Sequence, residues 1–208
     1  MKNYFILIIL FAYSCTMSPK NKFQNLASNE KLSYTNFLHP QLSNQFNIKV
    51  HVEKNQEHIQ NMSLGIYDKK SNALLDSFII NTDNTYRNDL FYFQNTQSFC
   101  TNYNVNKENR EYNTGDIIVA DFNFDNKDDI AVRQFRSTDS NVNYHFYIQQ
   151  NDHTFCYNSF LSESMSLFPS KIDKQTKTLT TEYKTNQKKT TQKNYRHSSA
   201  NGWLLLQE

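Results

Sequence analysis

Glycine is scarce in this sequence, which contains only Gly65, Gly115 and Gly202 among 208 residues. Phosphate-binding loops and dinucleotide-binding turns need several glycines close together, because their backbone N–H groups must approach a phosphate. The serine nucleophile motif Gly-x-Ser-x-Gly and the zinc-binding motif His-Glu-x-x-His are also missing. These absences exclude the common nucleotide-binding enzymes, serine hydrolases and zinc proteases. We therefore predict no catalytic residues and expect a protein that is not an enzyme.

Net charge is also low, since 22 Lys and Arg residues stand against 20 Asp and Glu residues. A nucleic-acid-binding domain usually carries a pronounced basic surface. The one basic run, from residue 184 to 193, is explained more simply as the solvated turn of a β-hairpin. We expect no nucleic-acid partner.

Aromatic residues are abundant, with 16 Phe and 13 Tyr. Such a composition favours β-strands and argues against disorder. Short segments alternate apolar and polar residues and are separated by turns rich in Asn, Asp, Ser and Lys. The pattern predicts an all-β fold, an antiparallel β-sandwich or barrel-like domain. The segments are 46–52, 74–80, 144–148, 154–157, 177–183 and 203–206.

The N-terminus has the pattern of an export signal. Lys2 precedes the apolar run 6–11, and small residues lead up to Cys15. The run is too short to span a bilayer, which takes about 20 apolar residues. We predict a signal peptide over residues 1–14. The window ending at Cys15 resembles the lipobox of bacterial lipoproteins, which implies that Cys15 is lipidated and anchors the chain to a membrane. The alternative is an ordinary cleaved signal with an incidental cysteine.

Residues 15–45 are rich in Ser, Asn, Lys and Gln and keep no helical or strand period. Such a segment buries too little apolar surface to offset its ordering entropy. We predict a lipidated tether over 15–45 and a β-domain over 46–208. No acidic cluster follows Cys15, so we expect a lipid-anchored, periplasm-facing location in the cell envelope, with the outer membrane favoured over the inner.

The strongest chemical signal is an acidic loop between two apolar strands. Oxygen-bearing side chains recur at Asp121, Asn123, Asp125 and Asp129, and the backbone carbonyl of Lys127 completes the alternation. Several hard oxygens in one tight loop suit calcium, which takes 6–8 oxygen ligands. We predict a calcium-binding β-hairpin loop over 121–129. The alternative is an acidic turn satisfied by its own side-chain-to-backbone hydrogen bonds.

This loop is not an EF-hand, because the flanking residues favour strands and the twelfth position holds Val132 instead of Glu. It looks like the calcium loop of integrin α-chain repeats. From about Gly115 to the C-terminus, the sequence resembles bacterial periplasmic lipoproteins that carry one such loop in a fold related to lysozyme inhibitors. The resemblance rests on the acidic loop and on downstream matches at 143–148, Phe155, 161–162, Phe168 and 177–181.

A characterised member of that family is an immunity protein against a peptidoglycan-cleaving effector of a type IV secretion system. The resemblance therefore implies an inhibitor or immunity protein that binds a lysozyme-like peptidoglycan hydrolase. The lysozyme-inhibitor signature Ser-Gly-x-Tyr is absent from this chain. The alternative is a structural or scaffold lipoprotein that binds another envelope component without inhibiting it.

Two cysteines remain once Cys15 is set aside for the lipid. In an oxidising compartment, Cys100 and Cys156 are candidates for a disulfide. The alternatives are two buried thiols, or a geometry that keeps the two residues apart. The six histidines are scattered without metal-ligand spacing.

Overall fold

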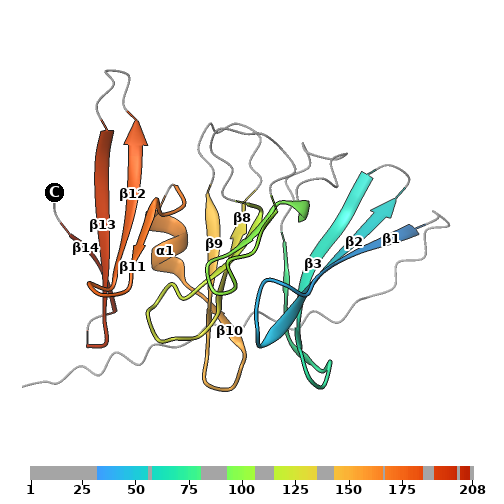
Figure 1. Ribbon diagram of the computed structural model, residues 1–208. Helices are drawn as coiled ribbons and strands as arrows, with labels where there is room; N and C mark the ends of the chain where they lie inside the picture. The colour runs from blue at the N-terminus through green and yellow to red at the C-terminus, as the bar shows by residue number, and fades with distance from the viewer. Residues whose placement is uncertain are drawn as a thin grey trace, which may run out of the picture.

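The computed structural model shows an assembly of three β-sheets stacked as three layers (Figure 1). The predicted signal peptide and the predicted lipidation site Cys15 lie outside the described residues. The described ranges are 32–55, 58–80, 93–105, 115–134, 143–165, 167–184, 190–200 and 202–206.

The first layer, called here the N-terminal sheet, is antiparallel with the order β1-β2-β3-β4. Its strands are β1 (Leu32–His39), β2 (Phe46–Asn55), β3 (His58–Asp68) and β4 (Leu74–Ile79). The β1–β2 pair keeps one register over all eight residues of β1, whereas both other pairs contain a bulge or irregularity.

The middle layer, the central sheet, has the order β10-β9-β8-β7-β5-β6, in which β5 and β7 are parallel and the other pairs antiparallel. Its strands are β5 (Thr96–Ser98), β6 (Asn104–Val105), β7 (Ile117–Ala120), β8 (Asp129–Arg133), β9 (Tyr144–Gln149) and β10 (Phe155–Tyr157).

The third layer, the C-terminal sheet, is antiparallel with the order β11-β12-β13-β14. Its strands are β11 (Lys171–Asp173), β12 (Thr178–Lys184), β13 (Thr190–Ser198) and β14 (Gly202–Leu206). Among the described residues, the one helix is α1 (Ser159–Ser164), which contacts β9. No helix in the described part of the chain is long and apolar enough to cross a membrane.

Two hydrophobic cores lie on opposite faces of the central sheet. On β7, Ile117 and Val119 face the N-terminal sheet, while Ile118 and Ala120 face α1 and the C-terminal sheet. All four residues of β7 are buried. A strand covered on both faces needs apolar residues at every position, and this requirement explains the continuous run Ile-Ile-Val-Ala.

The N-terminal sheet has one covered face, so its strands alternate. On β2, Ile48, Val50 and Val52 are buried, whereas Lys49 and His51 lie on the outer face. Alternation of this kind is expected for a sheet that packs on a core on one side only.

The all-β, mainly antiparallel prediction is confirmed, and the structure adds a third layer to the expected sandwich. The predicted hairpin around residues 184–193 is confirmed by the pairing of β12 with β13. The tether boundary at residue 45 is wrong, because β1 lies inside the predicted tether. Its own sequence is weakly patterned, and pairing with β2 makes it a strand while Phe37 packs on the first core.

Candidate functional site at the loop end of the three sheets

The acidic loop of residues 121–128 connects β7 to β8 in the middle of the central sheet. Two of its residues have left-handed backbone conformations, Phe124 with φ 63° and Asn126 with φ 66°. Asn tolerates this conformation better than most residues, whereas Phe does not. Phe124 is held there by packing, because its side chain is buried and lies 6.2 Å from the Trp203 ring, measured between centroids.

Side chains of the loop accept hydrogen bonds from its own backbone. The two carboxylate oxygens of Asp121 accept from the Asp125 and Asn126 amides at 2.9 and 3.1 Å. Asn123 Oδ1 also accepts from the Asp125 amide, at 3.1 Å, and Asp125 Oδ1 accepts from the Lys127 amide at 2.9 Å. These bonds are the ones expected of a self-satisfied acidic turn.

Lys127 contributes its side chain as well as its backbone. Its ammonium donates to Asp125 Oδ2 at 3.0 Å and to Asn151 Oδ1, in the turn between β9 and β10, at 2.9 Å. The sequence predicted a role only for the Lys127 carbonyl. The ammonium contact connects the acidic loop to the next turn of the same sheet.

Asp129 is the buried anchor of the loop. Its Oδ2 accepts from the amides of Phe122 and Asn123, and its Oδ1 accepts from the amide of Gln149 on β9. Burial raises the pKa of this carboxyl well above its ordinary value, and the amide bonds counteract the rise. Asp129 therefore ties the two ends of the loop to the neighbouring strand.

Asp128 connects the loop to the N-terminal sheet. Ser43 Oγ, in the turn between β1 and β2, donates to Asp128 Oδ2 at 2.6 Å.

The Cys100 thiol lies beside the same carboxylate, and the pKa of this thiol is raised by burial and by the charge of Asp128. Cys100 is a free thiol, so the predicted disulfide between Cys100 and Cys156 is wrong. No local pattern indicates that Cys100, two residues beyond the end of β5, lies beside the acidic loop.

The C-terminal sheet also contacts the loop. Lys174 Nζ, in the turn between β11 and β12, lies 3.7 Å from Asp121 Oδ2.

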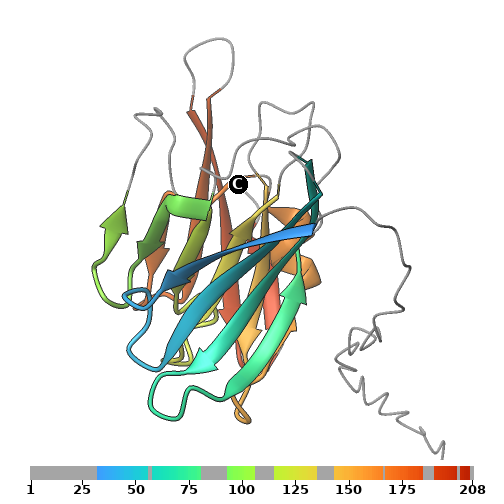
Figure 2. The same ribbon diagram turned by 90° about the vertical axis from the view of Figure 1, so that its right-hand side faces the viewer.

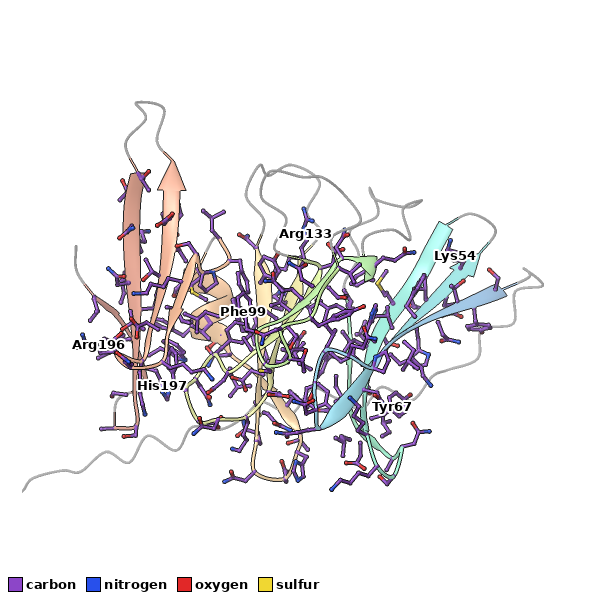
Figure 3. All side chains as sticks on the ribbon, in the orientation of Figure 1. Lys54, Tyr67, Phe99, Arg133, Arg196 and His197 are labelled. Carbon is purple, nitrogen blue, oxygen red and sulfur yellow. The ribbon has the colours of Figure 1, made fainter. Side chains whose placement is uncertain are left out.

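His197 on β13 packs against Trp203, with ring centroids 5.1 Å apart. The pKa of His197 is lowered by burial and by the charge of Lys177, while Asp125 and Asp121 act in the opposite direction. Figure 3 shows His197 on the side of the C-terminal sheet that faces the central layer.

Further bonds connect the remaining turns at this end of the molecule. Thr101 Oγ1 donates to the Gln41 carbonyl at 2.7 Å, and Lys69 Nζ donates to the carbonyls of Pro40 and Ser43. Turns from all three sheets thus meet around the acidic loop. We call this surface the loop end; it comprises residues 40–45, 69–73, 99–103, 121–128, 150–154 and 174–177.

The loop offers calcium the right kind of donor, because the side chains of Asp121, Asn123 and Asp125 present only oxygens as acceptors. Each of these oxygens that takes one amide hydrogen bond keeps a second lone pair. Within the described ranges, however, no three Asp, Glu, His or Cys side chains converge as a metal site. The hydrogen bonds of the alternative interpretation are present, and the calcium site stays a prediction.

Several residues in or beside the loop end were not predicted from the sequence: Ser43, Thr101 and Lys174 within it and His197 on β13 beside it. Cys100 was predicted only as a disulfide partner. They come from turns and strands up to 85 positions away from the loop residue that they contact. No local pattern marks them, since each is an ordinary turn or strand residue. Only the stacking of the three sheets brings them to the acidic loop.

Comparison with known proteins gives little direct guidance. No known family matches the sequence, and no curated protein matches it. Among solved structures, the chain is similar to the "Structure of a Xanthomonas Type IV Secretion System related protein", with a TM-score of 0.41 and 11% sequence identity. The similarity covers 83% of this chain and 93% of the other. A likeness at this level indicates no function for this chain.

Proposed function

We propose that this chain is a binding protein of the bacterial envelope, anchored through Cys15, that blocks a peptidoglycan hydrolase with its loop end. The observation that carries the proposal is the junction at residues 121–129. One loop takes contacts from Ser43 of the N-terminal sheet and from Lys174 of the C-terminal sheet. It thereby holds turns of all three layers in one surface.

A surface of this kind suits an inhibitor. Binding costs less when the side chains and loops of an interface are already ordered, and inhibitors of hydrolases typically change little in shape when they bind. The turns of the loop end are fixed by hydrogen bonds between elements, among them Ser43 to Asp128 and Thr101 to Gln41. The loop end can therefore meet a rigid cleft at a low entropic cost.

Binding is supported over catalysis by the state of the acidic residues. Asp129 is buried and accepts three backbone amides, Asp128 accepts from Ser43, and Asp125 pairs with Lys127. A general acid or base must have an oxygen within reach of a substrate proton. Each of these carboxylates already bonds a group of the chain, so none of them is held as a free acid or base, and we propose that the protein is not an enzyme.

Calcium is the second part of the proposal. The residues that would hold it are Asp121, Asn123, Asp125 and Asp129, together with the Lys127 carbonyl. A bound calcium ion supplies positive charge to a loop crowded with carboxylates. The chain's own contribution is to order the loop through its amide hydrogen bonds, so that the neighbouring turns keep their positions.

The test is a peptidoglycan hydrolysis assay in which the chain from residue 16 onward is added to lysozyme-like hydrolases, with calcium or with a chelator. We expect inhibition that is stronger with calcium, together with a higher melting temperature. The double substitution Asp121→Asn and Asp125→Asn should remove both calcium effects. Glu182→Gln is the matched control, because Glu182 is an exposed acidic residue of β12 that lies outside both the predicted ligand set and the loop end.

The outcomes separate the two parts of the proposal. Inhibition that ignores calcium and chelator would leave the binding role and remove the metal. A calcium-dependent rise in melting temperature without inhibition of any hydrolase would instead indicate a structural or scaffold lipoprotein. The absence of both effects would overturn the proposal.

A further inference from the structure

The outer face of the N-terminal sheet carries exposed apolar side chains on both of its edge strands, β1 and β4. Tyr34 is 70% exposed, Leu38 56% and Ile79 61%. In Figure 2 this face is turned toward the viewer, and no described element lies across it. Large exposed apolar side chains that share one face mark an interaction surface more often than scattered ones do.

Polar side chains on the same face are held in place by one another. His51 bonds to Asn36 Oδ1 through Nδ1 at 2.6 Å and to the Tyr67 hydroxyl through Nε2 at 3.3 Å. Asn61 donates to Glu53 Oε2 at 2.6 Å. The face is therefore ordered in the free chain, so docking it against a partner immobilises few further rotamers.

Gly65 explains how the Tyr67 ring lies close to the sheet. A Cβ atom at Gly65 would come within 2.8 Å of Tyr67 Cε2, so only glycine leaves room for the ring. Lys49 Nζ lies 4.7 Å from the centroid of that ring. The ring thus adds a flat surface beside the charge of Lys49. Figure 3 labels Tyr67 on this sheet.

The residues of this face are arranged symmetrically about one row. The row consists of Asn36, His51, Ser63 and Ile79, which are cross-strand partners on β1 to β4. Two positions from it along β1 lie Tyr34 on one side and Leu38 on the other. Two positions from it along β2 lie Glu53 on one side and Lys49 on the other.

A rotation by half a turn about an axis that runs along this row places a second copy of the face against the first. The strands of the two copies are then antiparallel. In that arrangement Lys49 faces Glu53 of the second copy, and Leu38 faces Tyr34 of the second copy. Each contact occurs twice, since a two-fold axis pairs the same patch with itself. The second copy therefore supplies an opposite charge for Lys49 and for Glu53, and an apolar contact for Leu38 and for Tyr34.

We propose that the chain forms a two-fold symmetric dimer through the outer face of its N-terminal sheet, with a second copy of the chain as the occupant. Strands about 4.8 Å apart and rising about 3.3 Å per residue give the four-stranded face a footprint on the order of 600 Å². Standard protein interfaces take about 600–1,000 Å² of accessible surface from each partner, so this face lies at the lower limit of that range. The face is thus large enough for a dimer of modest affinity.

Charge reversal tests the proposal on the full chain by sedimentation equilibrium in a density-matched detergent. Lys49→Glu and Glu53→Lys should each raise the dimer dissociation constant by about tenfold or more at low salt, because each change replaces two attractive pairs by two repulsive ones. The double variant should restore dimerisation, since the opposite charges meet again. Lys70→Glu is the matched control, as Lys70 lies in the β3–β4 turn away from this face.

The variant Leu38→Asp gives a second test, which does not depend on the charge pair of Lys49 and Glu53. Leu38 is exposed, so the variant should fold, which circular dichroism checks, and it should be monomeric. A wild-type chain that stays monomeric at every concentration would overturn the proposal. So would a dimer that survives both single reversals, or one that the double variant does not restore.

Discussion

At the residue scale, the acidic side chains of the loop differ in burial and in the hydrogen bonds that they accept. Asp121, Asp125 and Asp129 look equivalent in the sequence, as oxygen donors at regular spacing in one loop. The structure separates them, because Asp129 is fully buried and Asp125 is exposed. A buried carboxylate needs hydrogen-bond donors from the chain, whereas an exposed one can bond to water.

Replacing Asp129 tests this difference. Asp129→Ala leaves three backbone amides without their acceptor, and we expect a loss of more than about 3 kcal/mol of unfolding free energy. Asp125→Ala removes an exposed ion pair and one amide bond, and should cost below about 1 kcal/mol. Urea denaturation of both variants without calcium measures the two values. Equal losses would contradict the anchoring role of Asp129.

Glycine scarcity leads to a related expectation, that left-handed turn positions fall largely to Asn and Asp. This is confirmed in part, since Asn72, Asn102 and Asn126 have positive φ angles while no Asp among the described residues does. Phe124, His153 and Lys177 fill the other positions. Their conformations are set by the closure of turns whose strands are already paired, which local preference does not reveal.

At the scale of elements, the alternation of apolar and polar residues predicts strands whose one face packs on a core. It does not predict strands that form only because they pair with a neighbouring strand. β2, with regular alternation, was predicted from its sequence. β1 was not, because its residues form a strand only against β2. Among the described residues, the one helix is α1, and it begins after a capping residue: Asn158 Oδ1 accepts from the Leu161 amide at 2.9 Å.

The cap of α1 gives a prediction for this element. Asn158→Ala removes the acceptor of the first turn, and losses of this kind are typically about 1 kcal/mol. Asn158→Asp keeps an acceptor and should be nearly neutral. Thermal unfolding of the two variants compares them. A loss in the Asp variant as large as in the Ala variant would show that the cap does not stabilise α1.

At the scale of the whole molecule, stability depends on ionisable groups that folding buries. Asp116 is fully buried and pairs with Arg133 at 3.3 Å. Burial raises the pKa of Asp116 from 3.8 to about 8, although Arg133 acts in the opposite direction. Between these two values the folded chain binds a proton that the unfolded chain has released. The contribution of Asp116 to the unfolding free energy is thus full below the pKa of this carboxyl in the unfolded chain, and it is lost as pH rises toward about 8.

Asp116→Asn should flatten this dependence. We expect the unfolding free energy of the wild type to fall between about pH 5 and pH 8, and that of the variant to fall less, because Asn carries no titrating proton. Urea denaturation at both pH values measures the slopes. Slopes that remain parallel would show that Asp116 has the same pKa in the folded and unfolded chain.

The sequence by itself determined the class of fold, the positions of the well-patterned strands and the acidic loop. These features are local, since alternation and loop composition act over a few neighbouring residues. Only the tertiary structure decided that β1 belongs to the domain, that three layers stack, and that Ser43, Cys100 and Lys174 surround the loop. Such contacts join residues far apart in the chain, and they depend on how sheets pack, which no short pattern encodes.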